Sequence, residues 1–418
     1  MIGGDMILKH IVCEDVDENQ VLLIPPPNGH TMTFFGAWAI IVNLILTYDH
    51  NYLPGKLGCG ILQSATVGFV VFAINTLSYL VYMRCWRFGH DSSYAGLWKS
   101  LIGKSSMWIP RVMIIIGYIY FVVEFVCAMT NDIKIILEYC NIKDISDVTI
   151  SYAISLLTFI FFGPFPDVSV FVRHSIVSLF SCLAIISIAV YVLYTKYQYT
   201  GLPKNLSWWN PSFYSLEAAS IYSIDIFMHP FNHAIYSRLE KPSLKRMNYN
   251  GILIQVFVTF WIFILGTIGY ITFPNNNSSD PIYWKYSKNL KLIASIPNFI
   301  NSFTTNGVIV NLIQREMVDL FLEGTSNKNT AIIPAAVLLL FIGGSLVLWP
   351  INLRSNVKIL GDVINCFLSY ILPYIFYIKM KEKMTACEKA VITILSLLGI
   401  TLTGFLLYVD YVRLMQTL

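Results

Sequence analysis

Long apolar segments alternate with short polar loops along most of this chain. A run of about 20 apolar residues is long enough to cross a bilayer as one helix. We find about eleven such runs, at positions 33–54, 60–83, 108–129, 149–163, 168–194, 212–236, 251–273, 290–313, 331–349, 357–380 and 388–412. The pattern therefore predicts an all-α integral membrane protein, with a polar cytosolic tail at 1–32 and a transmembrane domain at 33–413.

Composition supports this prediction and removes several classes of function. Of 418 residues, 56% are hydrophobic and 12% are charged, whereas soluble chains carry roughly 25% charged residues. The formal charge of +4 is small and the basic residues are scattered, so we expect a lipid bilayer and no nucleic acid as partner. The eight cysteines lack zinc-like spacing, although Cys59 and Cys140 are placed where a disulfide is conceivable. Without a nucleophile–base pair or a phosphate loop, we expect no enzyme, metal centre or cofactor.

The loops indicate which side of the membrane each end faces. Lys and Arg concentrate in short loops around 84–111, 238–246 and 379–389, which places these loops and the N-terminus in the cytosol. N-glycosylation sequons at Asn205 and Asn276 fall in loops on the opposite side. The sequence leaves open whether the membrane is the plasma membrane or a vacuolar or lysosomal membrane.

His229 and Pro230 interrupt the sixth apolar run in its middle. Pro230 has no amide hydrogen for the carbonyl about one turn earlier, near Ile226, so we predict a broken helix. Such a break is tolerated in a membrane where protein or a solvated cavity surrounds it, and transporters use broken helices to bind their cargo. With a second break in the first run, eleven spans fit two inverted five-helix repeats plus one extra helix.

Several motifs resemble the amino acid/auxin permease family. The motif FMHP at 227–230 and the loop IYSRLEKPSLKRM at 235–247 resemble the sixth helix of that family and its following loop. The endings GTIGYITF at 266–273 and LPYIFYIK at 372–379 extend the similarity. The resemblance implies a LeuT-like fold and secondary active transport of amino acids, coupled to protons or sodium, by alternating access around broken first and sixth helices.

The first helix departs from the family pattern. Asn43 and Leu53-Pro54 keep the family's spacing, but Thr47-Tyr48-Asp49 replaces its glycine-x-glycine. Close approach of a substrate to the backbone is harder without glycine, and an ionised Asp49 would repel a substrate carboxylate. Either the substrate chemistry has changed or Asp49 is neutral during binding.

We predict two overlapping groups of site residues in the middle of the membrane. The substrate-binding residues are Asn43, Thr47, Asp49, Asp225, Met228 and His229. The ion-coupling residues are Asn43, Asp49, Ser302 and Thr305. The LeuT-like fold that the resemblance implies joins the first and eighth spans at a sodium site, which pairs Asn43 with Ser302 and Thr305. An ionised carboxylate such as Asp49 or Asp225 costs at least ~2.5 kcal/mol inside a bilayer, so intramembrane acids favour a functional role.

Each group also has a simpler interpretation. The polar residues of the eighth run share one helix face; they are Ser295, Asn298, Ser302, Thr305 and Asn306. Their neutral oxygens suit sodium, but a polar contact between two helices explains the same spacing. Asp225, His229 and His233 are four residues apart, which would suit a metal in an unbroken helix, although Pro230 makes that geometry doubtful.

Two other functions stay open. A divalent metal transporter of similar architecture would use Asp49, Asn51, Met228 and His229 as ligands, although the loop after the sixth helix argues against it. A non-transporting amino acid sensor would bind the same cargo and signal through the N-terminal tail.

Overall fold

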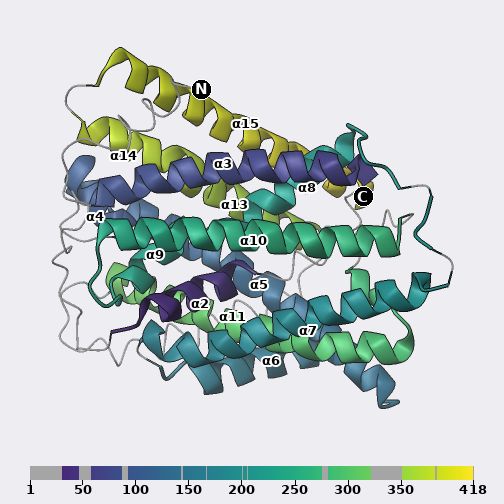
Figure 1. The fold of residues 1–418 in the computed structure, drawn as a ribbon. Helices are drawn as coiled ribbons and strands as arrows, with labels where there is room; N and C mark the ends of the chain where they lie inside the picture. Colours follow the sequence, from purple (N-terminus) through teal and green to yellow (C-terminus); the bar gives the residue numbers. More distant parts are fainter. Residues whose placement is uncertain are drawn as a thin grey trace.

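The computed structural model describes residues 31–46, 58–86, 93–142, 145–165, 167–199, 201–204, 206–274, 281–321, 351–381 and 384–417 (Figure 1). These residues form helices joined by short loops, and no β-strand occurs among them. The long helices lie side by side in one bundle, and the loops gather at its two ends (Figure 1). The predicted all-α class is confirmed.

Most predicted spans correspond to one helix or to a pair of helices. In chain order the helices are α2 (Phe34–Ile45), α3 (Ile61–Cys85), α4 (Tyr94–Leu101), α5 (Trp108–Tyr139), α6 (Asp147–Phe162), α7 (Val172–Tyr197), α8 (Phe213–Asp225), α9 (His229–Tyr236), α10 (Leu244–Thr272), α11 (Lys288–Phe321), α13 (Ile351–Cys366), α14 (Leu372–Met380) and α15 (Ala386–Thr417). The predicted run at 331–349 lies outside the described residues, so the number of spans stays a prediction.

Length and apolarity mark the helices that can cross a membrane. Six described stretches qualify: Ile61–Cys85, Lys104–Tyr139, Val168–Tyr197, Leu244–Thr272, Ile359–Met380 and Ala386–Val409. Large rings such as Phe69, Phe180 and Phe260 are exposed on them by 68%, 66% and 62%. Lipid tails solvate such rings without the penalty that water would impose, as expected for a bilayer-facing perimeter.

Two expectations need correction. α5 continues to Tyr139, beyond the predicted end at 129, so Asp132 lies inside the helix. The extension is favoured because Asp132 and Ile135, three residues apart, share a buried face. The suggested disulfide is wrong, since no bond joins Cys59, which is buried, to Cys140, which is exposed.

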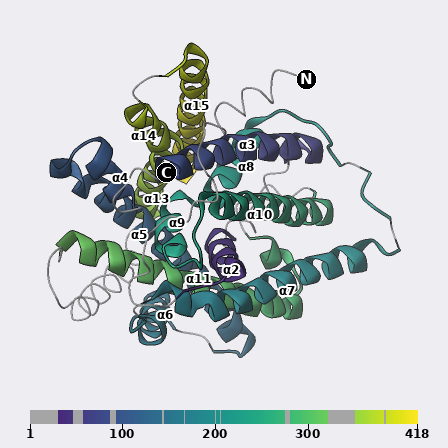
Figure 2. The same cartoon turned by 60° about the vertical axis from the view of Figure 1, so that its left-hand side comes forward.

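α2 occupies the centre of the bundle. Ala39 and every residue from there to Leu46 are buried. The helix packs against α7, α9, α10 and α11, as the view in Figure 2 shows. Thr33 caps its N-terminus by accepting a 3.1 Å hydrogen bond from the amide of Gly36. The buried C-terminal end at Leu46 is therefore presented to the interior of the protein.

Two spans are interrupted within the described part of the bundle, while the predicted break in the first span lies beyond Leu46, outside the described residues. α8 ends at Asp225 and α9 begins at His229, so the predicted break before Pro230 is confirmed. A π-helical turn, Phe367–Ile371, interrupts the tenth span. There the carbonyl of Leu368 accepts a 2.8 Å hydrogen bond from the hydroxyl of Tyr94, so a neighbouring helix satisfies the distorted backbone.

Candidate functional site

The break in the sixth span is buried within protein. Ile226, Phe227 and Met228 are at most 3% exposed. Nδ2 of Asn75, on α3, donates a 2.9 Å hydrogen bond to the carbonyl of Ile226, the region where the sequence predicted a freed carbonyl. A buried carbonyl without a partner costs about 1–3 kcal/mol, so Asn75 stabilises the broken geometry.

Gln255 on α10 holds the other side of the break. Its Nε2 lies 3.4 Å from Sδ of Met228, and its Oε1 accepts a hydrogen bond from the hydroxyl of Thr76 on α3. Both Gln255 and Asn75 are fully buried. Amides from two neighbouring helices therefore fix the non-helical segment in one position.

His229 begins α9 among aromatic rings. The rings of Tyr79 and Tyr82 lie 5.9 Å from its imidazole, and that of Phe227 lies at 6.4 Å. The side chain is 0% exposed and neither ring nitrogen forms a hydrogen bond of normal geometry, although the backbone of Ser78 is close. These surroundings disfavour a charged imidazole. In this conformation His229 is a packed residue of the break.

A chain of hydrogen bonds ties the first and sixth spans together on one side of His229. The hydroxyl of Tyr79 donates to the carbonyl of Met247 at 2.8 Å and lies 3.4 Å from that of Tyr236. Tyr236 bonds Oδ1 of Asn250 at 3.1 Å, and Asn250 donates to the carbonyl of Phe34 at 3.2 Å. The end of α9 and the start of α2 are therefore linked through α10.

Asn43 and Thr305 join α2 to α11. The hydroxyl oxygen of Thr305 lies 2.8 Å from Oδ1 of Asn43 and 3.1 Å from its carbonyl oxygen. One turn earlier on α11, Nδ2 of Asn301 donates to the carbonyl of Leu46 at 3.1 Å. All four residues are at most 2% exposed. The two side chains that the sequence paired across these helices do meet, while their role in ion coupling stays a prediction.

α7 adds two hydroxyl groups to this contact. Nδ2 of Asn43 lies 3.3 Å from Oγ of Ser175, and the hydroxyl of Ser178 donates to Oδ1 of Asn301 at 2.6 Å. We call these residues, with Thr305, the polar seam. Neutral oxygens from three helices converge there, which is the ligand type that hard cations prefer. In this conformation the seam groups satisfy one another.

The other predicted site residues have different outcomes. Ser302 is 1% exposed on α11, but the hydrogen bonds of the seam run through Asn301 and Thr305. Thr47 and Asp49 lie outside the described residues, and so does the side chain of Asp225. Among the side chains that are described, no three of the types His, Cys, Asp and Glu are grouped to hold a metal.

Sequence reasoning missed Asn75, Gln255 and Asn301. Asn301 follows Asn298 by three residues and precedes Thr305 by four, so the helical spacing already noted for this face would have included it. Asn75 and Gln255 are amides within largely apolar stretches of α3 and α10, which is a signal for a buried partner but not for its identity.

Ion pairs close the end of the bundle that carries the loop between α9 and α10. Oδ2 of Asp167 lies 3.0 Å from Nη2 of Arg238, and Oδ1 lies 3.6 Å from Nη2 of Arg315 on α11. The backbone of Met32 pairs with the same loop, bonding the carbonyl of Arg238 at 2.7 Å and the amide of Glu240 at 2.9 Å. The concentration of Lys and Arg in this loop assigns this end of the bundle to the cytosol.

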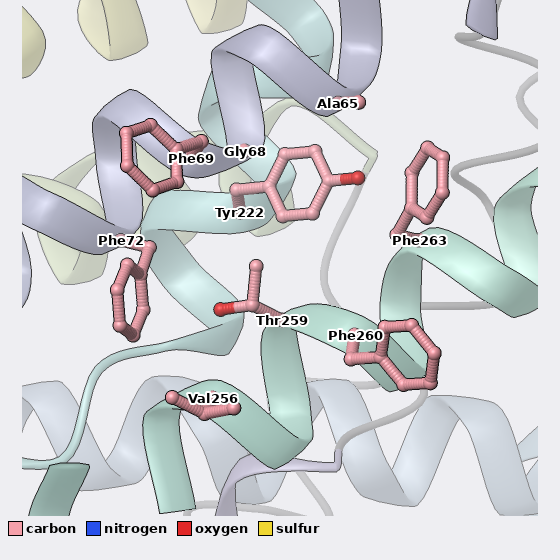
Figure 3. A pocket seen from close by; sticks show the side chains of 9 residues that line it. All are labelled: Ala65, Gly68, Phe69, Phe72, Tyr222, Val256, Thr259, Phe260 and Phe263. Atoms are coloured by element: carbon pink, nitrogen blue, oxygen red, sulfur yellow. The ribbon is translucent and has the colours of Figure 1, made fainter. Parts of the chain in front are cut away.

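A separate pocket of about 250 Å³ lies between α3, α8 and α10 (Figure 3). Phe72, Tyr222 and Thr259 line it, as Figure 3 shows. Phe69 and Phe260 on its lining are 68% and 62% exposed, so it opens on the outer surface of the bundle. It is distinct from the break and from the polar seam, and we assign it no substrate.

Comparisons with known proteins agree with this architecture. A family model described as transmembrane amino acid transporter protein matches residues 58–412. A Na⁺-coupled sialic acid symporter in a substrate-bound outward-open state aligns with a TM-score of 0.61 and 10% identity, over 99% of this chain and 97% of that one. MhsT in complex with L-phenylalanine aligns at 0.60 and 10%, over 90% and 100%.

A third structure is Mhp1, a nucleobase-cation-symport-1 family transporter in a closed conformation with bromovinylhydantoin bound. It aligns with a TM-score of 0.54 and 10% identity, over 93% of this chain and 92% of that one. At this identity the three likenesses show the fold alone, which is the LeuT-like fold that the sequence predicted.

Proposed function

Because the chain belongs to the transmembrane amino acid transporter family, we propose that it is a secondary active transporter that binds its amino acid between the break in the sixth span and the predicted break in the first. The observation that carries this proposal is the buried break between α8 and α9, held by Asn75 and Gln255. Half-helix ends present partial charges, positive at the start of α9 and negative at the ends of α2 and α8. Those ends suit the carboxylate and the ammonium group of an amino acid.

The proposed substrate contacts are the residues named from the sequence. Met228 and His229 come from the break, and Asn43 from the seam side of α2. Thr47, Asp49 and Asp225 complete the set as a prediction. Alternating access would then move α2 and the broken sixth span relative to α5 and α11, opening one end of the bundle as the other closes.

We further propose that the polar seam responds to the coupling cation. Asn43 and Thr305 of the seam, with Ser302 on the same helix as Thr305, offer neutral oxygens, which favour sodium, whereas a proton needs a titratable group such as Asp49. A cation in the seam would replace the bonds between Thr305 and Asn43 and would thereby fix α2 against α11. The membrane would be the plasma membrane or that of a vacuole or lysosome.

Reconstitution tests the transport function. Purified protein in liposomes is given single labelled amino acids under an imposed sodium gradient, a pH gradient or no gradient. We expect accumulation of at least one amino acid under one cation gradient and none without it. Binding without accumulation would indicate a sensor. Uptake of manganese or iron that no amino acid competes with would indicate a metal transporter, and either result would overturn the proposal.

Thr305→Val tests the seam. Valine keeps the shape and removes the hydroxyl bonded to Asn43, so we expect the cation concentration for half-maximal uptake to rise by about tenfold, the equivalent of 1.4 kcal/mol. Thr401→Val is the matched control, because the hydroxyl of Thr401 is exposed and bonds its own helix at Leu397. If Thr305→Val and Thr401→Val need the same sodium concentration for half-maximal uptake, the polar seam does not take part in ion coupling.

A further inference from the structure

A second buried polar group lies away from the break and the seam. Asp132, near the end of α5, is 0% exposed. The hydroxyl of Tyr283, in the segment between α10 and α11, donates a 2.8 Å hydrogen bond to its Oδ1. The side chain of Asn298 on α11 lies against the same carboxyl. Oδ2 is buried and forms no hydrogen bond with any described residue.

The surroundings of Asp132 are apolar. Ala128 and Ile135 on α5 pack with Tyr283 and with Ala294 of α11, and Ile188 of α7 covers this cluster. The charged and titratable groups on the adjoining elements are engaged elsewhere or exposed. At this end of the bundle, Lys134 pairs with Asp147 of α6 at 2.7 Å, and Lys196 of α7 donates to the carbonyl of Thr272. Lys288 and Lys291 of α11 lie over the rings of Tyr139 and Trp284, Tyr286 is partly buried, and Glu138 and Lys285 are exposed. Glu124, eight residues before Asp132 on α5, is half-buried.

A carboxylate buried in this way needs a neutralising partner. Burying an ionised carboxylate without one costs several kcal/mol, so the group stays buried when a proton or a cation neutralises it. Hard cations take about six or more oxygen ligands, whereas Asp132, Tyr283 and Asn298 supply few, and the side chains of Ala128, Ile135 and Ala294 that pack with Tyr283 supply none. The site therefore suits a proton, carried on Oδ2 while Oδ1 accepts from Tyr283.

The same face of α11 connects this carboxyl to the first span. Asn298 precedes Asn301 by one helical turn, and Asn301 donates to the carbonyl of Leu46 at the end of α2. On its other side Asp132 is covered by Tyr283. Tyr283 belongs to a loop that the distribution of Lys and Arg among the loops places outside the cytosol. Opening this end of the bundle would separate Tyr283 from Asp132 and admit water.

We propose that Asp132 is a proton-binding site that controls closure of this end of the transporter and so makes uptake depend on external pH. The inference rests on the proposed transport function. A neutral Asp132 can be buried as the end closes, whereas an ionised one resists closure. Uptake should therefore fall as external pH rises, by up to about tenfold per pH unit, the limit for a single titrating group.

The test uses Asp132→Asn in liposomes at a fixed sodium gradient and a range of external pH. The amide is neutral at every pH, so we expect its uptake to stay flat where that of the wild type falls. Glu138→Gln, an exposed acid on the same helix, is the control and should keep the wild-type profile. A wild type that transports, with Asp132→Asn following the same pH profile, overturns the proposal.

A second measurement does not need transport. Infrared spectra of the purified full-length protein should contain the carbonyl stretch of a protonated carboxylic acid that Asp132→Asn removes and Glu138→Gln retains. If the wild type accumulates no amino acid, the transport proposal fails, and this band still decides whether Asp132 holds a proton. If Asp132→Asn does not fold, Tyr283→Phe should alter the frequency of the band, and an unaltered band overturns the assignment.

Discussion

Two buried carboxyl groups, Asp167 and Asp132, lie in opposite halves of the bundle and have opposite surroundings. Each contacts α11, Asp167 through Arg315 and Asp132 through Asn298. These two contacts are 17 residues apart on one helix (315 − 298), which corresponds to about 25 Å. Asp167 lies between two guanidinium groups, whereas Asp132 meets a phenol, an amide and apolar side chains.

The difference shows how an acid's neighbours decide what it can do. The charge of Asp167 is balanced within the protein, so the acid holds together the loop after α9, the segment before η5 (Val168–Phe171) and α11. The charge of Asp132 has no such balance among the described residues, so a mobile proton must supply it. One end of the bundle is closed by fixed charges, whereas closure of the other end depends on the pH of the solution on that side.

Removing the fixed charge should have the largest effect. Asp167→Asn leaves Arg238 and Arg315 side by side without their shared carboxylate. Breaking a buried pair costs about 3–5 kcal/mol, so we expect the free energy of unfolding in detergent to fall by about that amount, with a lower Tm and weaker uptake. A loss below about 1 kcal/mol would show that the Asp167 ion pairs are no stronger than exposed ones.

Giving Asp132 a cation of its own should make it resemble Asp167. Asn298→Lys places an ammonium group beside the carboxyl, so the proton is no longer required. We expect the pH dependence of uptake to flatten from up to about tenfold per pH unit to less than about twofold. Asn298→Gln keeps the amide and is the control. Retention of the full pH profile in Asn298→Lys would contradict the proposed role of charge balance.

The sequence predicted the parts of the molecule that depend on local chemistry. The break before Pro230 follows from a missing amide hydrogen, and most span limits follow from runs of apolar residues. The extension of α5 to Tyr139 was missed because its last turns are amphipathic rather than uniformly apolar. The link between Asn43 and Thr305 came from a family resemblance and proved to be a direct contact.

Pairings between distant segments could not be obtained in this way. Asn75 and the carbonyl of Ile226 meet because α3 packs against α8, and no local pattern specifies which amide reaches which carbonyl. For the same reason, the sequence did not predict that Asp132 and Asp167 have opposite surroundings. Asp132 lies beyond the predicted end of its span at 129, and its phenol partner, Tyr283, lies in a loop 151 residues away along the chain.

Weakening the surroundings of Asp132 without changing its charge should have a moderate effect. Tyr283→Phe removes the donor to Oδ1 and leaves the ring in place. A hydrogen bond to a charged group contributes about 1.5–3 kcal/mol and favours the ionised form, so its loss should move the midpoint of the uptake–pH profile upward by about one pH unit. The profile is measured beside Tyr286→Phe, a neighbouring phenol. If the uptake–pH profiles of Tyr283→Phe and Tyr286→Phe are equal, Tyr283 does not affect the protonation of Asp132.

Neutralising an exposed acid near Asp132 should have the smallest effect. Asp147 lies 2.7 Å from Lys134, closer than Asp167 lies to Arg238 at 3.0 Å, but its side chain is 55% exposed against 9% for Asp167. Water and salt screen such a pair, which contributes about 1 kcal/mol or less. Asp147→Asn should therefore leave both the Tm and the uptake–pH profile close to wild type. A loss as large as that of Asp167→Asn would mean that distance, and not burial, separates the acids of this protein.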